Sequence, residues 1–108
     1  YNEITLPDID GATASFTDAV KIGEKLYFIA AAEKSNSTYH DGEVAGTLLG
    51  RIDIETMTVE FTETISLKNK FEGLTLYKDR SDSLEFLLCE DTDSDDTESD
   101  IFKLTLKK

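Results

Sequence analysis

The chain contains an internal repeat, and no other feature constrains its fold as strongly. Residues 16–22 and 26–33 match residues 70–76 and 84–91. Each copy has an acid near the start of one apolar segment, a polar turn, a second apolar segment anchored on Phe, and an acid at its end. The copies are offset by about 54 to 58 residues, which is the size of one four-stranded propeller blade with a long loop.

The sequence has the pattern of short β-strands throughout and no convincing helical period. β-branched and aromatic residues cluster in short runs that Gly, Asp, Asn and Ser separate. The run 26–32 is almost continuously apolar, as expected for a strand buried on both faces. Residues 30–34 have a helix-forming composition, but they match residues 88–92 of the second copy, so we expect a strand. We predict strands at 4–6, 16–22, 26–32, 48–54, 59–67, 71–77, 84–89 and 101–106, with a tight turn at 23–25.

These patterns predict an all-β protein of antiparallel four-stranded repeats, built as two β-propeller blades. Residues 1–10 would be the outer strand of a preceding or closing blade, 11–69 the first blade, and 70–108 a second blade that lacks its outer strand. A complete propeller needs about four to eight blades, so we expect part of a larger, six-bladed propeller. Either the chain is a fragment, or three two-blade copies assemble. The alternative is a compact seven-stranded sandwich or barrel that folds alone.

The charge of the chain limits its partners. The net charge is −12, and seven of the 23 acids lie between Glu90 and Asp100. An acidic surface repels nucleic acid and anionic membranes, and no apolar run is long enough to span a bilayer. We therefore expect no nucleic-acid partner and no membrane insertion. The partners that the fold requires are upstream blades or other copies of the chain, which would close the ring.

Several stretches resemble a known group of proteins. Lys70-Phe71-Glu72-Gly73-Leu74, with Phe86-Leu87-Leu88 and Asp91-Thr92-Asp93, is similar to the C-terminal blades of uncharacterised bacterial β-propellers related to phytase-like (esterase-like) and SdiA-regulated propellers. The resemblance covers residues 16–106, including the loop and third strand at 41–53. It implies a propeller in which Glu-Gly-Leu opens an inner strand facing the central channel, and it allows a channel-mouth metal such as Ca²⁺. A phosphate-binding signature rich in His or Arg, as in a true phytase, is missing from the sequence.

Four acids are candidate metal ligands: Asp18, Glu33, Glu72 and Asp91. Asp18 opens one strand of an expected hairpin and Glu33 ends the other, so both should lie at one end of it. Glu72 and Asp91 have the same relation in the second copy. Four carboxylates on one rim suit a hard cation, which relieves their mutual repulsion. The alternative is that these acids are solvated strand ends or cap backbone amides.

Several other residues can be interpreted in two ways. Lys70 and Arg51 are candidate ligand-binding residues, although Arg51 also suits a structural ion pair. Residues 91–95 resemble the opening of a calcium loop, but Asp96 and Phe102 occupy the positions where an EF-hand requires Gly and Glu. His40, beside Asp41, would be an exposed loop residue rather than a general base. We expect Cys89, the one cysteine, to be a small buried hydrophobe.

Three functions fit these residues. The first is a non-enzymatic segment of a bacterial β-propeller with a binding or scaffold role. The second is a Ca²⁺-dependent, phytase-like or esterase-like hydrolase with an acidic site at the channel mouth. The third is a purely structural pair of blades whose binding site lies elsewhere. The sequence leaves open whether the protein is an enzyme, because neither a substrate nor a nucleophile motif can be identified.

Overall fold

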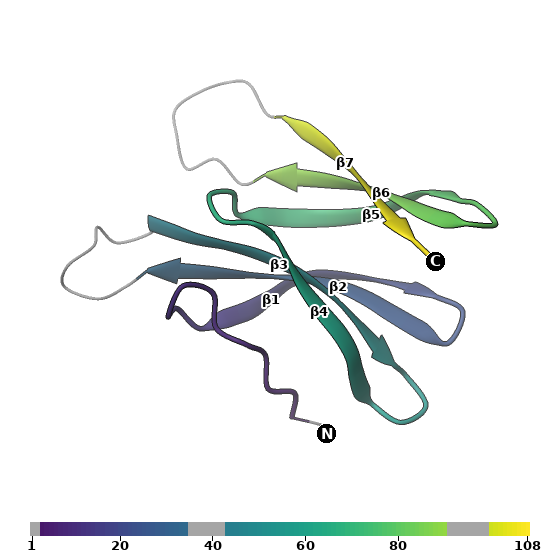
Figure 1. Cartoon of the computed structure of the whole chain (residues 1–108), viewed down its shortest axis with the longest axis horizontal. Coiled ribbons are helices and arrows are strands. Elements are labelled where there is room, and N and C mark those ends of the chain that lie inside the picture. Colours follow the sequence, from purple (N-terminus) through teal and green to yellow (C-terminus); the bar gives the residue numbers. More distant parts are fainter. Residues whose placement is uncertain (1–2, 35–42, 91–99) are drawn as a thin grey trace.

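A computed structural model of the chain describes residues 3–34, 43–90 and 100–108, which form two antiparallel β-sheets (Figure 1). The first sheet has the order β1-β2-β3-β4 and the second has the order β5-β6-β7, so each is a meander. No helix occurs among the described residues, and none there could cross a membrane. The all-β prediction is confirmed. The strands are β1 (Ala14–Ile22), β2 (Lys25–Lys34), β3 (Glu43–Asp53), β4 (Thr58–Ser66), β5 (Phe71–Asp79), β6 (Ser83–Glu90) and β7 (Ile101–Lys107).

The central strand β2 is buried on both faces, as its composition predicts. Residues 27–32 are all buried, and β2 pairs with both β1 and β3. The segment with helix-forming composition is therefore strand, as expected. The β1–β2 turn consists of Gly23 and Glu24, and Gly23 has a φ of 61°, which glycine adopts without strain. β3 begins at Glu43 rather than at residue 48, because its first residues continue the pairing with the end of β2.

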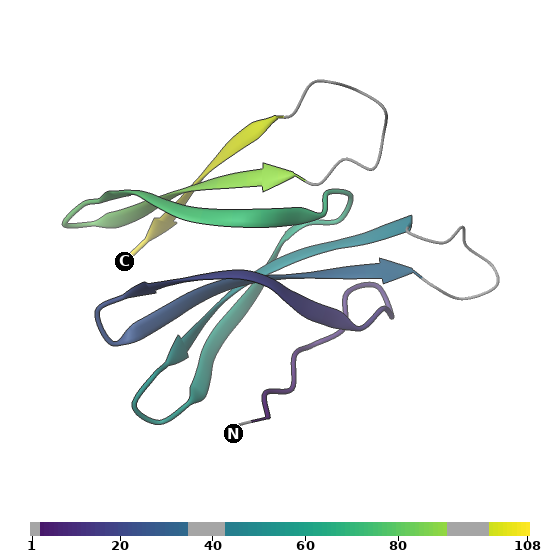
Figure 2. The same ribbon diagram turned by 180° about the vertical axis from the view of Figure 1, so that it is seen from behind.

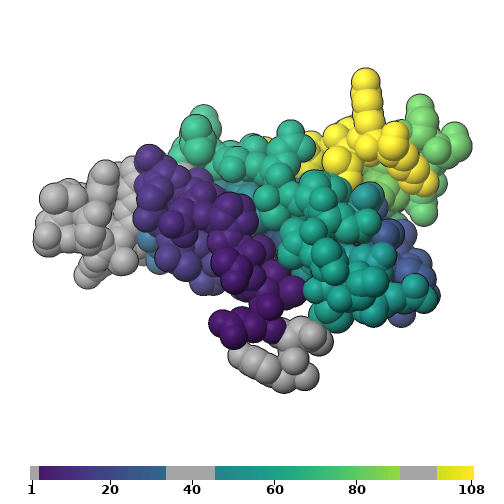
Figure 3. All heavy atoms as spheres, turned by 60° about the horizontal axis from the view of Figure 1, so that its bottom comes forward, coloured from purple at the N-terminus to yellow at the C-terminus, as the bar shows by residue number. Residues whose placement is uncertain are grey.

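The predicted strand at 4–6 is absent. Residues 3–8 have no regular structure, and Leu6 packs against the first sheet on the face opposite the second sheet. Figure 3 shows the purple N-terminal segment lying on that face. The segment then turns through Asp10 and Gly11, whose φ angles are 49° and 79°, and Ile9 and Ala12 exchange two backbone hydrogen bonds of 2.9 Å. Residues 4–6 form no strand because a strand needs a free sheet edge beside it, and they instead contact a sheet face.

Two apolar clusters lie on opposite faces of the first sheet. We call the cluster between the sheets the inter-sheet core, and the cluster on the other face the outer core. Phe28 belongs to the outer core, where Gly50 makes room for its ring, because a Cβ on Gly50 would lie 2.2 Å from the ring. The inter-sheet core consists of Tyr27, Ile29, Leu49, Phe71, Leu74, Leu84, Phe86 and Leu88. The outer core consists of Ile9, Ala14, Phe28, Ala30, Ala32, Leu48 and Ile52.

The two sheets approach each other along their first strands. β5 contacts β1 and β2, and Figure 2 shows it running beside them. The chain therefore leaves the first sheet at its last strand, β4, and returns through residues 67–70 to the position beside the first strand, β1. The residues predicted to form a functional site lie near this junction.

Candidate functional site at the junction of β1 and β5

Asp18 and Thr17 of β1 bond to the backbone of β5. Asp18 Oδ2 accepts a 2.8 Å hydrogen bond from the Leu74 N–H, and its Oδ1 accepts one of 2.8 Å from the Ala19 N–H. Thr17 Oγ1 donates to the Phe71 carbonyl at 2.9 Å. A bulge between residues 16 and 18 of β1 interrupts its pairing with β2 at Thr17. Both oxygens of the Asp18 carboxylate thus have backbone partners, so this acid links the two sheets.

Lys70 lies between two of the predicted metal ligands. Its ammonium group hydrogen-bonds to the Glu33 carboxylate and lies 3.2 Å from Glu72 Oε1. The hydrogen bond to Glu33 raises the pKa of Lys70 well above its usual range, and this outweighs the opposing effect of partial burial. Lys70 therefore stays charged and offsets the repulsion between the two carboxylates.

These side chains line a pocket of about 370 Å³, which we call the Lys70 pocket. Its walls combine a cation, two carboxylates and three hydroxyls, so it offers both donors and acceptors to a polar ligand. The lining comes from β1 and the residue before it, from the end of β2, and from the start of β5 and the residue before it. The lining residues are Thr13, Ser15, Thr17, Ala31, Glu33, Lys70 and Glu72.

The four predicted metal ligands are only partly brought together. Glu33 and Glu72 share Lys70 as an ion-pair partner. Asp18 lies in the middle of β1, where it pairs with Ile29, because β1 begins at Ala14, four residues before Asp18. The expectation that Asp18 and Glu33 share a hairpin end is therefore wrong. Asp91 lies outside the described residues. Within the part of the chain that the structure describes, no group of three or more His, Cys, Asp or Glu is arranged to hold a metal.

Arg51 is remote from Lys70, so the two predicted ligand-binding residues do not form one site. Arg51 pairs with Tyr27 in the β2–β3 register, whereas Glu33 pairs with Val44 toward the other end of β2. The Arg51 Nε lies 3.1 Å from Glu60 Oε1, and its guanidinium is 5.1 Å from the centre of the Phe61 ring. The structural ion pair considered for this residue is present.

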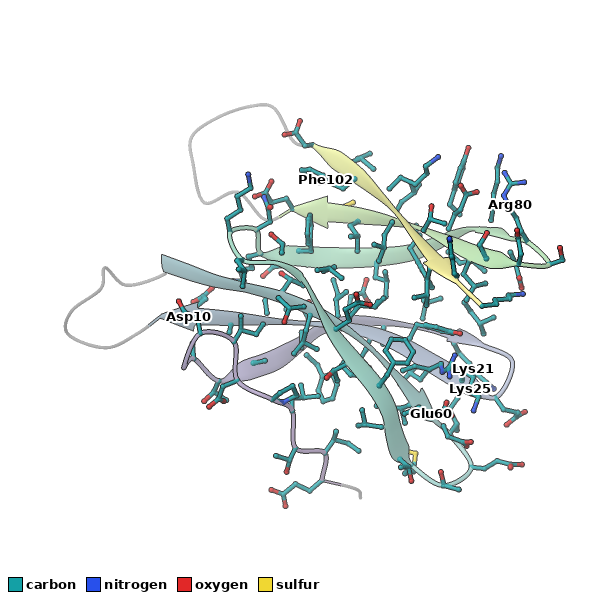
Figure 4. All side chains as sticks on the ribbon, viewed as in Figure 1. Asp10, Lys21, Lys25, Glu60, Arg80 and Phe102 are labelled. Atoms are coloured by element: carbon teal, nitrogen blue, oxygen red, sulfur yellow. The ribbon has the colours of Figure 1, made fainter. Side chains whose placement is uncertain are left out.

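A cation–carboxylate cluster continues from Arg51 to the β1–β2 hairpin end. Lys25 Nζ lies 2.7 Å from Glu60 and 3.2 Å from Asp53. Figure 4 shows Lys21, Lys25 and Glu60 together at this end of the sheet, with Asp10 at the opposite end. These pairs are partly exposed, so we assign them a modest structural role.

A hydrogen-bond network that the sequence pattern does not predict holds the chain where it passes from β4 to β5. The buried Thr47 hydroxyl of β3 accepts from the Phe71 N–H at 3.1 Å and donates to the Asn69 carbonyl at 2.6 Å. Asn69 also donates from Nδ2 to Glu90 at 2.8 Å, and its N–H donates to Ser66 Oγ at 2.9 Å. The Ser66–Asn69 spacing is a local turn signal, whereas nothing near Thr47 in the sequence indicates its distant partners.

The predicted burial of Cys89 is wrong. Cys89 is exposed, because side chains alternate along β6 and its neighbour Leu88 occupies the inter-sheet core. His40, and the calcium-loop-like stretch at 91–95, lie outside the described residues.

Comparison with known proteins identifies one family. Residues 1–106 match the model of a family of unknown function, DUF6929. No curated protein and no solved structure matches the chain. The comparisons thus supply no relative that supports similarity to phytase-like or SdiA-regulated propellers.

Proposed function

The chain belongs to DUF6929, and we propose that it acts there as a segment of a bacterial β-propeller with a binding or scaffold role. The supporting observation is the contact between β1 and β5, the first strands of the two sheets. They lie side by side and are joined through Asp18 and Thr17, while later strands follow outward in chain order. Consecutive propeller blades have this relation around a central axis.

The burial of the first sheet supports blades over an isolated sandwich. In a two-sheet sandwich, each sheet has one face in the core and one face toward solvent. Here the first sheet has apolar clusters on both faces, the inter-sheet core and the outer core. A blade inside a propeller packs against a neighbouring blade on each side, so it needs apolar residues on both faces.

The chemistry of the Lys70 pocket supports binding over Ca²⁺-dependent hydrolysis. A Ca²⁺ ion takes six to eight oxygen ligands, but Glu33 and Glu72 already share a lysine, and Asp18 accepts two backbone hydrogen bonds. An ammonium group between two carboxylates, with hydroxyls nearby, suits a polar organic ligand that exchanges hydrogen bonds with both. We therefore propose that the Lys70 pocket is the binding site.

Ligand mapping by NMR tests the binding role. A library of small polar fragments is added to ¹⁵N-labelled protein, and we expect amide shifts to cluster at Thr17, Glu33 and Glu72. Lys70→Met should remove these shifts, while Lys21→Met, at the exposed far end of β1, should leave them unchanged. Shifts that cluster elsewhere, or survive in Lys70→Met, would overturn the Lys70 pocket as the site.

Thermal unfolding with EDTA or millimolar Ca²⁺, at matched ionic strength, tests the hydrolase alternative. For a binding or scaffold segment we expect no Ca²⁺-specific change in Tm. A Ca²⁺-specific rise that Glu72→Gln abolishes would instead favour the hydrolase, because a ligand that binds only the folded state stabilises it.

A further inference from the structure

We propose that the chain associates head to tail with a second copy, and that residues 3–8 of one copy form a fourth strand on β7 of the other. This inference rests on the proposed function, because it treats the two sheets as consecutive blades. In this association, the outer face of the second sheet of one copy packs on the outer core of the next copy.

The second sheet is one strand short of the first. Among the described strands, β7 pairs with β6 alone, so its other edge carries backbone N–H and C=O groups without strand partners. Such an edge is a template for an added strand. A groove of about 830 Å³ between β7 and the end of β4, lined in part by Ile65, Leu67, Phe102 and Leu104, leaves room beside this edge.

Residues 3–8 have the sequence of the missing strand. Ile4 and Leu6 are half-buried and alternate with the exposed Glu3 and Thr5, as in a strand with one covered face. Ile4-Thr5-Leu6 also resembles Ile65-Ser66-Leu67, which ends the fourth strand of the first sheet and leads to the next inner strand, β5. By the same pattern, residues 3–8 would end the fourth strand of a preceding sheet and lead to β1.

The outer faces of the two sheets can cover each other. On the first sheet, a hollow of about 360 Å³ is lined by apolar side chains that include Ile4, Phe16, Phe28 and Met57. Phe16 remains 50% exposed although its ring contacts Phe28 edge-on. On the second sheet, Tyr77 and Ile101 are 52% and 67% exposed. Apolar surface on both faces favours mutual burial.

Charge complementarity identifies a second copy as the partner. Residues 3–8 contain Glu3 and Asp8 and no base, whereas β7 contains Lys103 and Lys107 and no acid. Leu48 of β3 pairs with Ala30 of β2, and Phe102 of β7 pairs with Leu88 of β6. Because Ala30 and Leu88 are matching positions of the repeat, Leu48 and Phe102 hold equivalent places in the two sheets.

Thr47, which pairs with Ser66, therefore corresponds to Ile101. β3 and β4 have a bulge between Thr47 and Leu48. A regular antiparallel ladder without that bulge, with Thr5 beside Ile101, would place Glu3 beside Lys103, an attractive cross-strand pair.

Light scattering during size-exclusion chromatography tests the association. The 12.0 kDa chain should show a concentration-dependent mass of several copies. Glu3→Lys should weaken association about fivefold, equivalent to about 1 kcal/mol, and adding Lys103→Glu should restore it. Glu24→Lys makes the same charge change as Glu3→Lys in the exposed β1–β2 turn and should have no effect.

Cross-linking tests the register without perturbing charge. In a Cys89→Ser background, Thr5→Cys and Ile101→Cys proteins are mixed and oxidised; the disulfide requires Cα atoms within about 7 Å. A heterodimer in yield above the two homodimers would support the register. A monomer at all concentrations, or association that ignores the Lys103→Glu and Glu3→Lys changes, would overturn the inference. If fragments still bind the Lys70 pocket of such a monomer, the proposed binding role survives.

Discussion

At the scale of single residues, Thr47 shows how one hydroxyl can hold a connection between sheets. Its side chain is fully buried, and its Oγ1 accepts from the Phe71 N–H and donates to the Asn69 carbonyl. Both partners belong to the segment that carries the chain from β4 to β5. The bond to the Phe71 N–H is buried, so water cannot replace Thr47 as the partner of that group.

Thr47→Val keeps the shape of the side chain and removes both hydrogen bonds. We expect the free energy of unfolding to fall by about 1–3 kcal/mol, because the Phe71 N–H would be left buried and unpaired. Urea denaturation measures the loss, and hydrogen exchange should be faster at the Phe71 amide. Thr47→Ser, which retains the hydroxyl, should leave that exchange slow. Equal exchange in the two variants would contradict this role.

At the scale of elements, β6 carries a nearly buried carboxylate that its neighbours on either side neutralise. Glu85 is 8% exposed, with Arg80 Nε at 3.1 Å and Lys103 Nζ at 3.5 Å. Arg80 lies at the β5–β6 turn (Figure 4), and Lys103 on β7. The hydrogen bond from Arg80 holds the pKa of Glu85 below its usual range, against the effect of burial. These pairs link the three strands of the second sheet.

Glu85→Gln should destabilise the protein in a pH-dependent manner. A carboxyl group with a lowered pKa in the folded state stabilises that state above its unfolded pKa, and the stabilisation disappears as the pH falls through the folded pKa. The wild-type Tm should therefore exceed that of Glu85→Gln at pH 7, and the difference should shrink at pH below about 4. Glu24→Gln, in the exposed β1–β2 turn, is the matched control. A difference independent of pH would exclude the charge as the cause.

At the scale of the whole molecule, the two sheets are held together by apolar packing and by a few directed bonds near β1 and β5. The inter-sheet core supplies the packing, which is not directional. Asp18 and Thr17 add hydrogen bonds to the Leu74 N–H and the Phe71 carbonyl, which set how β5 lies along β1. Together with the bond from the Phe71 N–H to Thr47 of β3, these two polar groups of β1 therefore set the relative placement of the sheets.

Asp18→Ala tests this coupling. We expect a loss of about 1.5–3 kcal/mol in unfolding free energy, the usual range for a hydrogen bond to a charged group, and faster hydrogen exchange at the Leu74 amide. Asp18→Asn keeps an acceptor oxygen and should lose less stability. If both variants unfold at the wild-type urea concentration, Asp18 does not couple the sheets.

The sequence by itself determined the positions of the seven observed strands and the β1–β2 turn. Alternation and apolar runs are local properties, so the doubly buried β2 and the Gly23-Glu24 turn could be predicted from neighbouring residues. The repeat also predicted two similar sheets. The Asp10-Gly11 turn had a recognisable signal of the same local kind.

Only the tertiary structure decided which faces and partners these strands have. Residues 4–6 have a strand pattern, but a strand also needs an adjacent edge, and in this chain they contact a sheet face instead. Phe28 belongs to the outer core and Cys89 is exposed because packing between sheets selects the buried face of each strand. The position of Lys70 between Glu33 and Glu72 joins residues 37 positions apart. Such a contact depends on how two sheets pack, which no local pattern encodes.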